Sequence, residues 1–153
     1  MLQECDNIMM EGQNSGRPAQ MMSFNDAVTN CLINNYMNFS GRASKSEYWW
    51  FLLFSFIIGF IAGLIDYFAF GVQVGFATLI MLIVIALPSI ALTVRRIHDF
   101  GQSGWLFLFV IIPYIGSVFT LIFGIMEGEE YPNQYGKVPT NIIKKNTNIY
   151  DNY

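Results

Sequence analysis

Two long stretches of this chain are almost free of charge, and they limit its possible folds more than any other feature. Between Tyr48 and Val94 the only formally charged side chain is Asp66, and between Phe100 and Met126 there is none. A helix that crosses a bilayer needs about 20 apolar residues. The first stretch is long enough for two spans and the second for one. We predict an all-α integral membrane protein with three transmembrane helices, at about 49–70, 74–94 and 105–126.

The composition agrees with a membrane protein and argues against several other classes. Hydrophobic residues make up 54% of the chain and charged residues 12%, against roughly 25% charged in a soluble domain. The net charge is −3 and the chain has no basic run, so we expect no nucleic-acid partner. Cys5 and Cys31 lack the spacing of metal ligands and are interpreted as free thiols. We expect neither a metal nor a cofactor.

The segments around the apolar stretches are predicted to behave differently. Residues 1–22 are expected to be a disordered extension, 23–136 the membrane domain, and 137–153 a disordered polar tail. Ser23, with Asp26 three residues later, predicts the start of a helix. Apolar residues then recur on one face up to Tyr36, as in an amphipathic helix. This helix is predicted to lie in the membrane interface, with packing against the protein's own spans as the alternative.

Several residues mark the ends and irregularities of the spans. Ser44 and Glu47 have the spacing of a capping box, which predicts a helix that starts near Lys45. Pro88 is predicted to kink the second span, and the "IPYIG" stretch at 112–116 the third. Asp66 lies near the far end of the first span. We expect it at the opposite interface, with a polar contact inside the bundle as the alternative.

The basic residues near the spans predict the orientation of the chain. They precede the first span or follow the second, and the turn between those spans has none. By the positive-inside rule the N-terminus and the loop after the second span are cytoplasmic, and three spans place the C-terminus outside. The basic residues that carry this argument are Arg42, Lys45, Arg95 and Arg96.

That topology gathers a polar cluster at one membrane face. The stretch "RRIHDFGQSGW" at 95–105 holds the only histidine of the chain. Arg95 and Asp99 are four residues apart and are predicted to pair along the helix, with a further charge contact to Glu47. Gly101 and Gly104 are predicted to end the second helix, and Ser103 to cap the next. The candidate site residues are Arg42, Glu47, Arg95, Arg96, His98 and Asp99.

Functional readings of this cluster compete with a structural one. In the enzymatic reading His98 is a general base oriented by Asp99, but neighbouring helix residues do not face each other. The chain shows no nucleophile signature or phosphate loop, so we expect no enzyme. Arginine forks match phosphate, which keeps binding of an anion or an anionic lipid headgroup as an alternative. A channel or transporter component would need an oligomer with Asp66 facing the pathway.

Two long motifs in the chain resemble a known family. "GRASKSEYWW" at 41–50 and "RRIHDFGQSGW" at 95–105 are similar to the G-R-x-S-R-x-E-Y-W and R-R-L-H-D-x-G-x-S-G-W motifs of the domain of unknown function 805 family, small bacterial inner-membrane proteins. Pro113 and Gly116 match its I-P-x-I-G motif, and Asn133, Tyr135 and Gly136 its closing motif. The resemblance covers roughly 24–136 and implies a multi-span protein of the bacterial inner membrane, without implying an activity.

The sequence thus predicts a membrane scaffold or interaction module. Its expected partners are the lipid bilayer and, beyond that, anionic lipid headgroups or another membrane protein.

Overall fold

The computed structural model describes residues 21–71 and 75–139. Within these ranges every regular element is helical, and the only β pairing is an isolated bridge between Asn133 and Gly136. The elements are α2 (Phe24–Thr29), the π-helix η1 (Asn30–Asn34), α3 (Lys45–Phe70), α4 (Phe76–Asp99), the 3-10 helix η2 (Gly104–Phe107), α5 (Leu108–Ile111) and α6 (Ile115–Ile125).

The predicted terminal segments fall mainly outside the described residues. This applies to the disorder predicted for 1–20 and 140–153 and to the free thiol of Cys5. Met22, placed in the disordered extension by the prediction, is instead buried. Its carbonyl accepts a hydrogen bond of 2.8 Å from the indole of Trp50, so this residue packs against α3.

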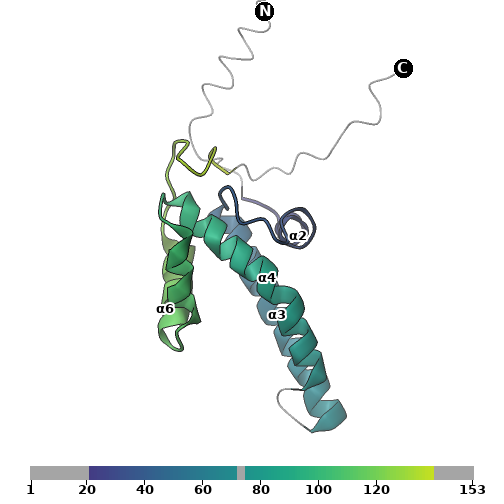
Figure 1. Cartoon of the computed structure of the whole chain (residues 1–153). Coiled ribbons are helices and arrows are strands. Elements are labelled where there is room, and N and C mark those ends of the chain that lie inside the picture. Colours follow the sequence, from purple (N-terminus) through teal and green to yellow (C-terminus); the bar gives the residue numbers. More distant parts are fainter. Residues whose placement is uncertain (1–20, 72–74, 140–153) are drawn as a thin grey trace, which may run out of the picture.

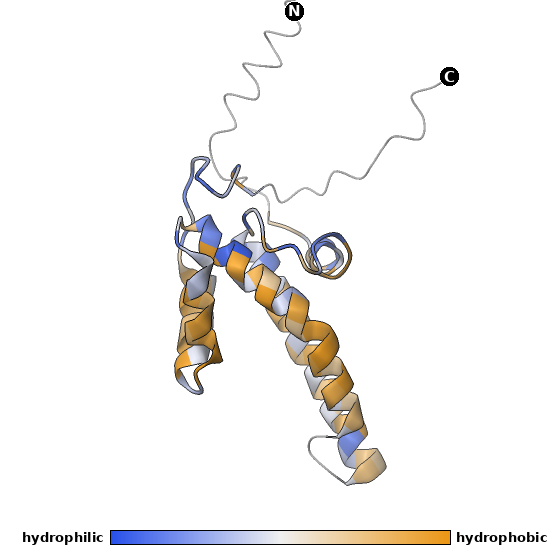
Figure 2. Cartoon of the chain, viewed as in Figure 1, coloured by the Kyte–Doolittle hydropathy of each residue, from blue (hydrophilic) through white to orange (hydrophobic). Residues whose placement is uncertain are grey.

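Helices α3 and α4 form a long antiparallel hairpin (Figure 1). With 26 and 24 residues they measure about 39 and 36 Å, more than the roughly 30 Å of a bilayer core. Both are long and apolar enough to cross a membrane, which confirms the first two predicted spans as helices. Ser44 caps α3 as predicted, since its hydroxyl accepts a hydrogen bond of 3.2 Å from the Glu47 amide. Most of the hairpin is apolar along its length (Figure 2).

Asp66 holds the far end of this hairpin together. Its carboxylate is fully buried and accepts hydrogen bonds from the backbone amides of Gly75, Ala77 and Thr78, at 2.9, 3.0 and 2.9 Å. The first amides of a helix have no partner within the helix, and the helix dipole favours a negative charge beside them. Asp66 therefore makes a polar contact within the hairpin, and its predicted place at the opposite membrane interface stays a prediction.

Pro88 leaves a gap in the hydrogen bonding of α4 that another segment fills. The helix continues past Pro88, but a proline has no amide proton to donate to the carbonyl four residues earlier. That carbonyl belongs to Val84, and it accepts a hydrogen bond of 2.7 Å from the hydroxyl of Tyr36 instead. Backbone groups at membrane depth need such partners because lipid offers none.

The third apolar stretch is two short legs, not one helix. The chain descends through η2 and α5, reverses at 112–114, and returns as α6. Ile112, held extended as expected before a proline, leads into Tyr114 with φ +65°. The Ile115 amide then donates to the Pro113 carbonyl at 2.8 Å, which closes a γ-turn. The predicted kink is thus a complete reversal.

This reversal means that the predicted third span is not confirmed. With 11 residues α6 is about 16 Å long, roughly half the thickness of a bilayer core. Its end returns to the end of α4 from which η2 departs, and the Glu129 amide donates to the Asp99 carbonyl at 2.8 Å. Gly116 allows the legs to meet, because a Cβ there would lie 2.0 Å from the Val110 carbonyl oxygen.

The segment before α3 packs on the hairpin. Ala27 and Cys31 are fully buried, and Phe24 meets Trp50 edge to face with ring centroids 5.8 Å apart. Ser23 caps α2 as predicted, by accepting a 3.2 Å hydrogen bond from the Asp26 amide. The helix is shorter than predicted, since it widens into the π-helix η1 at Asn30. Packing on the protein's own spans, the alternative from the sequence, is what the structure contains.

Two buried clusters make up the core, and both include residues of α4 or its end. One joins η1 and the loop after it to α3 and α4, and the other joins the end of α4 to α6 through Ile97, Phe100 and Phe123. The opposite half of the α3–α4 hairpin has no helix packed beside it (Figure 1). The polar residues are therefore positioned by the packed end.

We predict that Gly116→Ala lowers the free energy of unfolding by about 1–3 kcal/mol, because the added methyl group meets backbone that cannot rotate away. Gly63→Ala is the matched control, since nothing lies within 4 Å of its Cβ position, and should change stability by no more than about 1 kcal/mol. Unfolding by sodium dodecyl sulfate in mixed micelles, followed by tryptophan fluorescence, measures both. Equal stability of the two variants would contradict the close packing of α5 on α6.

Candidate functional site: a buried arginine–carboxylate cluster

The structure brings all six candidate residues to one end of the α3–α4 hairpin. The loop before α3 runs beside the last turns of α4, where the Ala43 amide donates to the Arg95 carbonyl at 3.0 Å. We call the six residues the arginine–carboxylate cluster: Arg42 from that loop, Glu47 from the first turn of α3, and Arg95, Arg96, His98 and Asp99 from the end of α4.

Asp99 is shared by two arginines. One carboxylate oxygen accepts a hydrogen bond of 3.0 Å from the Nε of Arg42, and the other accepts a hydrogen bond from the Nη1 of Arg96. The three side chains are all completely buried. The predicted pairing of Arg95 with Asp99 is wrong: Asp99 pairs with Arg96 three residues before it, and Arg95 turns toward α3. Both spacings place residues on adjacent turns, so the Glu47 carboxylate of α3, which pairs with Arg95, decided between them.

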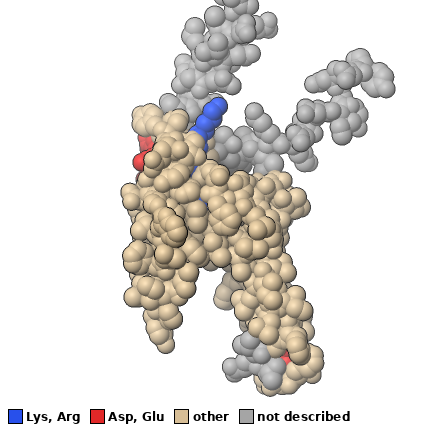
Figure 3. Space-filling view, in the orientation of Figure 1, with Lys and Arg blue, Asp and Glu red and all other residues tan. Residues whose placement is uncertain are grey.

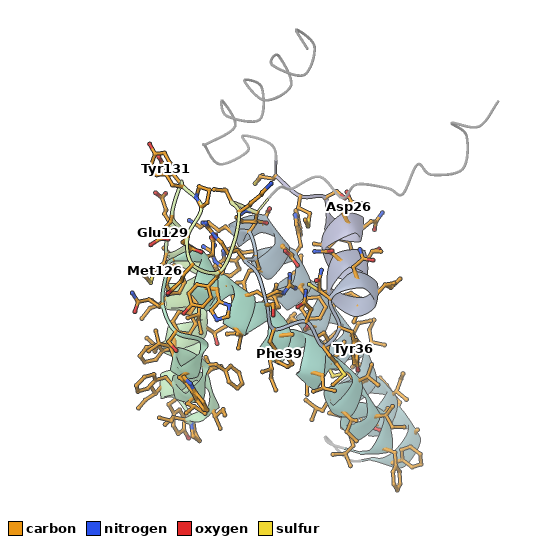
Figure 4. The ribbon with its side chains drawn as sticks, turned by 45° about the horizontal axis from the view of Figure 1, so that its top comes forward. Asp26, Tyr36, Phe39, Met126, Glu129 and Tyr131 are labelled. Carbon is orange, nitrogen blue, oxygen red and sulfur yellow. The ribbon has the colours of Figure 1, made fainter. Side chains whose placement is uncertain are left out.

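Arg42 and Arg96 also hold the returning end of the third apolar stretch. Arg96 donates from Nε to the Phe123 carbonyl at 3.0 Å and from Nη2 to the Met126 carbonyl. These carbonyls belong to the last turn and the cap of α6, which have no partners within the helix. Arg42 donates to the Tyr131 carbonyl at 2.8 Å and to the Glu129 carbonyl. Figure 4 shows Met126, Glu129 and Tyr131 along this returning segment.

Glu47 forms the second centre of the cluster. Its Oε1 accepts three hydrogen bonds: from Arg95 Nη2 at 3.0 Å, from the side-chain amide of Asn30 at 3.0 Å and from the Cys31 thiol at 3.4 Å. The predicted contact between the loop charges and Glu47 is confirmed, and it also includes η1. Glu47 therefore links η1, α3 and α4. Among the described residues the Nε of Arg95 is buried without a hydrogen-bond partner.

His98 takes no part in these ion pairs. Its Nδ1 lies 3.3 Å from the Gly41 carbonyl, and its ring stacks on Tyr135 with centroids 3.8 Å apart and an interplanar angle of 4°. Asn133 donates to the His98 carbonyl at 2.9 Å. His98 and Asp99 thus have different partners, and they do not form the base-and-carboxylate pair of the enzymatic interpretation.

Of the glycines and the serine after α4, Gly101 acts as predicted, whereas Gly104 begins η2 instead of ending α4. The helix ends at Asp99, and Gly101 turns the chain with φ +73°. Ser103 stands at the cap position of η2, but its side chain makes no capping hydrogen bond. The Lys and Arg atoms visible in Figure 3 lie at the end of the molecule opposite the far end of the α3–α4 hairpin.

Sequence reasoning missed several residues of the site. Asn30 and Cys31 were assigned to an amphipathic helix, and nothing in that pattern pointed to Glu47. Asn133 and Tyr135 were noted only as part of a closing motif, although that motif was the signal that could have found them. Within residues 21–71 and 75–139 no three His, Cys, Asp or Glu side chains are grouped so as to hold a metal ion.

Comparison with known proteins gives consistent matches over this region. The sequence model of a family described as "Protein of unknown function (DUF805)" matches residues 36–137. Inner membrane protein YhaI of Escherichia coli (strain K12) is 38% identical over 109 residues, which cover 71% of this chain and 91% of the relative. Inner membrane protein YhaH of the same strain is 37% identical over 112 residues, covering 71% and 92%. No solved structure matches the chain.

We predict that Arg95→Met lowers the free energy of unfolding by about 3–5 kcal/mol, because it leaves the Glu47 carboxylate buried without its cation. Adding Glu47→Gln to that variant should recover most of the loss, since no buried charge then remains at this centre. Lys137→Met, at an exposed position, is the control. Chemical unfolding in micelles measures all three. Losses that simply add in the double variant would show that the two side chains do not interact.

Burial, with the Glu47 carboxylate as the second cause, raises the pKa of the Cys31 thiol. In a Cys5→Ser background we therefore expect Cys31 to react with a maleimide at least about tenfold more slowly in the folded protein than after unfolding. The raised pKa stabilises the fold below the pKa of the unfolded thiol. The free energy of unfolding should thus fall as the pH rises above about 8.5, where only the unfolded chain ionises. Rapid labelling of the folded protein would contradict this burial.

Proposed function

The chain belongs to the DUF805 family of proteins of unknown function, and we propose that it acts as a structural or interaction module of the inner membrane, not as an enzyme. The observation that carries this proposal is the internal use of the arginines. The side chains of Arg42, Arg95 and Arg96 are at most 4% exposed, and each is paired with a carboxylate. Because these arginines are buried and paired within the protein, the cluster acts to hold its own segments together.

We further propose that α3 and α4 are the only full crossings among the described residues, and that η2, α5 and α6 form a re-entrant hairpin. This hairpin enters and leaves on the same side, so the N- and C-terminal segments share one face. The charge distribution supports this topology. All eight basic residues of the chain then lie on one side: Arg17, Arg42, Lys45, Arg95, Arg96, Lys137, Lys144 and Lys145.

Three spans would place the last three of these lysines outside, against the positive-inside rule. The re-entrant arrangement removes that conflict and puts both termini in the cytoplasm. It therefore replaces the external C-terminus expected from the sequence. The hydrogen bonds of Arg96 to the end of α6 support it directly, because they tie the returning leg to the end of α4.

The other functional readings find no support in the described residues. An anion would have to displace the carboxylates of Asp99 and Glu47 and the carbonyls that the arginines already contact. A transport pathway through Asp66 would break its three bonds to the start of α4. An enzymatic role for His98 lacks the orienting carboxylate, since Asp99 is bound by two arginines.

The remaining exposed surface supports an interaction role. Large apolar side chains on the unpacked half of the hairpin, such as Phe68 and Ile83, are 81% and 73% exposed. In a bilayer these faces meet lipid or a second membrane protein. We propose that lipid and a second membrane protein are both partners, and that the cluster fixes the fold that exposes these apolar faces.

The topology is tested with single cysteines at Gln73, Ser103 and Lys137 in a background without Cys5 and Cys31. We expect an impermeant maleimide to label only position 73 in spheroplasts, and positions 103 and 137 only after the membrane is opened. Labelling of 73 and 137 together would restore the three-span model. Labelling of 103 and 137 without 73 would invert the protein.

A further inference from the structure

A cavity lies beside the arginine–carboxylate cluster, and the ion pairs of the cluster do not fill it. It measures about 400 Å³ and lies between the end of α4, η2 and the loop after α6 that contains Tyr135. A volume of that size is within the range of small-molecule sites. The side chains that matter for its chemistry are His98, Ser103, Trp105, Phe107, Leu108 and Tyr135.

The first chemical feature is an unused acceptor on His98. Its Nδ1 faces the Gly41 carbonyl, which only accepts, so Nδ1 carries the proton of the neutral ring. The lone pair then lies on Nε2. A Cβ built on Gly104 would lie 3.1 Å from Nε2, and both residues line the cavity, so this nitrogen lies at the cavity wall. The site offers an acceptor to a ligand that donates.

The charge around the cavity favours a cation over an anion. The loop at 127–137 carries Glu127, Glu129 and Glu130 against Lys137, and all four are exposed. Glu129 reaches the turn between α4 and η2, since a Cβ on Gly101 would meet its Oε1. The arginines nearby are neutralised by their own carboxylates. The local field therefore attracts a positively charged group.

Aromatic and apolar walls complete the site. Trp105 is 78% exposed and Tyr135 is half-buried, and aromatic faces attract ammonium groups. Phe107 packs between the cavity and the core, and Leu108, which is 52% exposed, continues from the cavity onto the outer surface of α5. The Ser103 hydroxyl makes no capping bond, which leaves it free to donate to a phosphate oxygen. A tryptophan at this position is typical of headgroup depth.

We propose that this cavity binds the headgroup of an aminophospholipid, with phosphatidylethanolamine as the ligand to test. The primary ammonium donates to His98 Nε2 and lies against Trp105, the phosphate accepts from Ser103, and one acyl chain follows Phe107 and Leu108. The proposal rests on the membrane placement of the proposed function, because the lipid enters from the bilayer beside η2.

The test is native mass spectrometry of the purified protein with equimolar phosphatidylethanolamine, phosphatidylcholine and phosphatidylglycerol. We expect phosphatidylethanolamine to be retained most. Phosphatidylcholine keeps the positive charge but has no N–H to donate, so we expect about tenfold weaker retention, the loss of one charged hydrogen bond. Preferential retention of phosphatidylglycerol, or equal retention of all three, would overturn the proposal.

Two variants locate the site. Trp105→Ala should weaken retention of phosphatidylethanolamine about five- to tenfold with an unchanged unfolding midpoint. Tyr114→Ala, an aromatic side chain that is 91% exposed at the hairpin reversal, is the matched control and should retain it normally. His98→Phe keeps an aromatic ring against Tyr135 and removes the acceptor. Full retention in both Trp105→Ala and His98→Phe would overturn the assignment to this cavity.

Competition with soluble glycerophosphoethanolamine separates a lipid site from a site for free amines. We expect no displacement at millimolar concentrations, because the acyl chain contributes to binding. Complete displacement would overturn the lipid and leave a soluble amine as the ligand. All these measurements are made in micelles, so their failure leaves the cysteine-labelling test of the topology unaffected.

Discussion

The structure depends on the burial of Asp99 between Arg42 and Arg96. Removing charges from water costs several kcal/mol for each ion, and the loss is recovered only when every partner is in place. Here the partners come from three separate parts of the chain: the loop before α3, the end of α4, and the end of α6 with the segment that follows it. Each of these segments is fixed because leaving would expose an unpaired charge at a buried site.

A second constraint acts at membrane depth, where lipid offers no hydrogen bonds. The chain meets it with polar side chains placed at the weak points of its helices. Asp66 accepts hydrogen bonds from the first amides of α4. Tyr36 donates to the carbonyl that Pro88 leaves without a partner, and Arg96 donates to a carbonyl at the end of α6. Each of these three contacts gives a protein partner to a backbone group that its own helix leaves unpaired.

The same contacts bear on function. Arginines that complete helix ends and neutralise buried carboxylates are unavailable to a substrate or an anion, which favours a structural role for the cluster. His98 differs from its neighbours, because one ring nitrogen stabilises the loop and the other borders a cavity. The proposed lipid site and the structural cluster are therefore adjacent parts of one motif, with the ion pairs fixing the position of the histidine.

The sequence by itself determined the two long helices, the caps of α2 and α3 at Ser23 and Ser44, and the residues of the cluster, since these follow from hydropathy, local spacing and motifs. It did not determine the pairing within the cluster, because Arg95 and Arg96 both reach the next turn and only the Glu47 carboxylate, from a distant segment, distinguishes them. Nor did it determine the path of residues 105–126. An apolar run of that length can lie in lipid either as one crossing or as two short legs, and its hydropathy is the same in both cases. The tertiary structure decided between them, because Arg42 and Arg96 bind carbonyls at and beyond the end of α6 and draw that end back to α4.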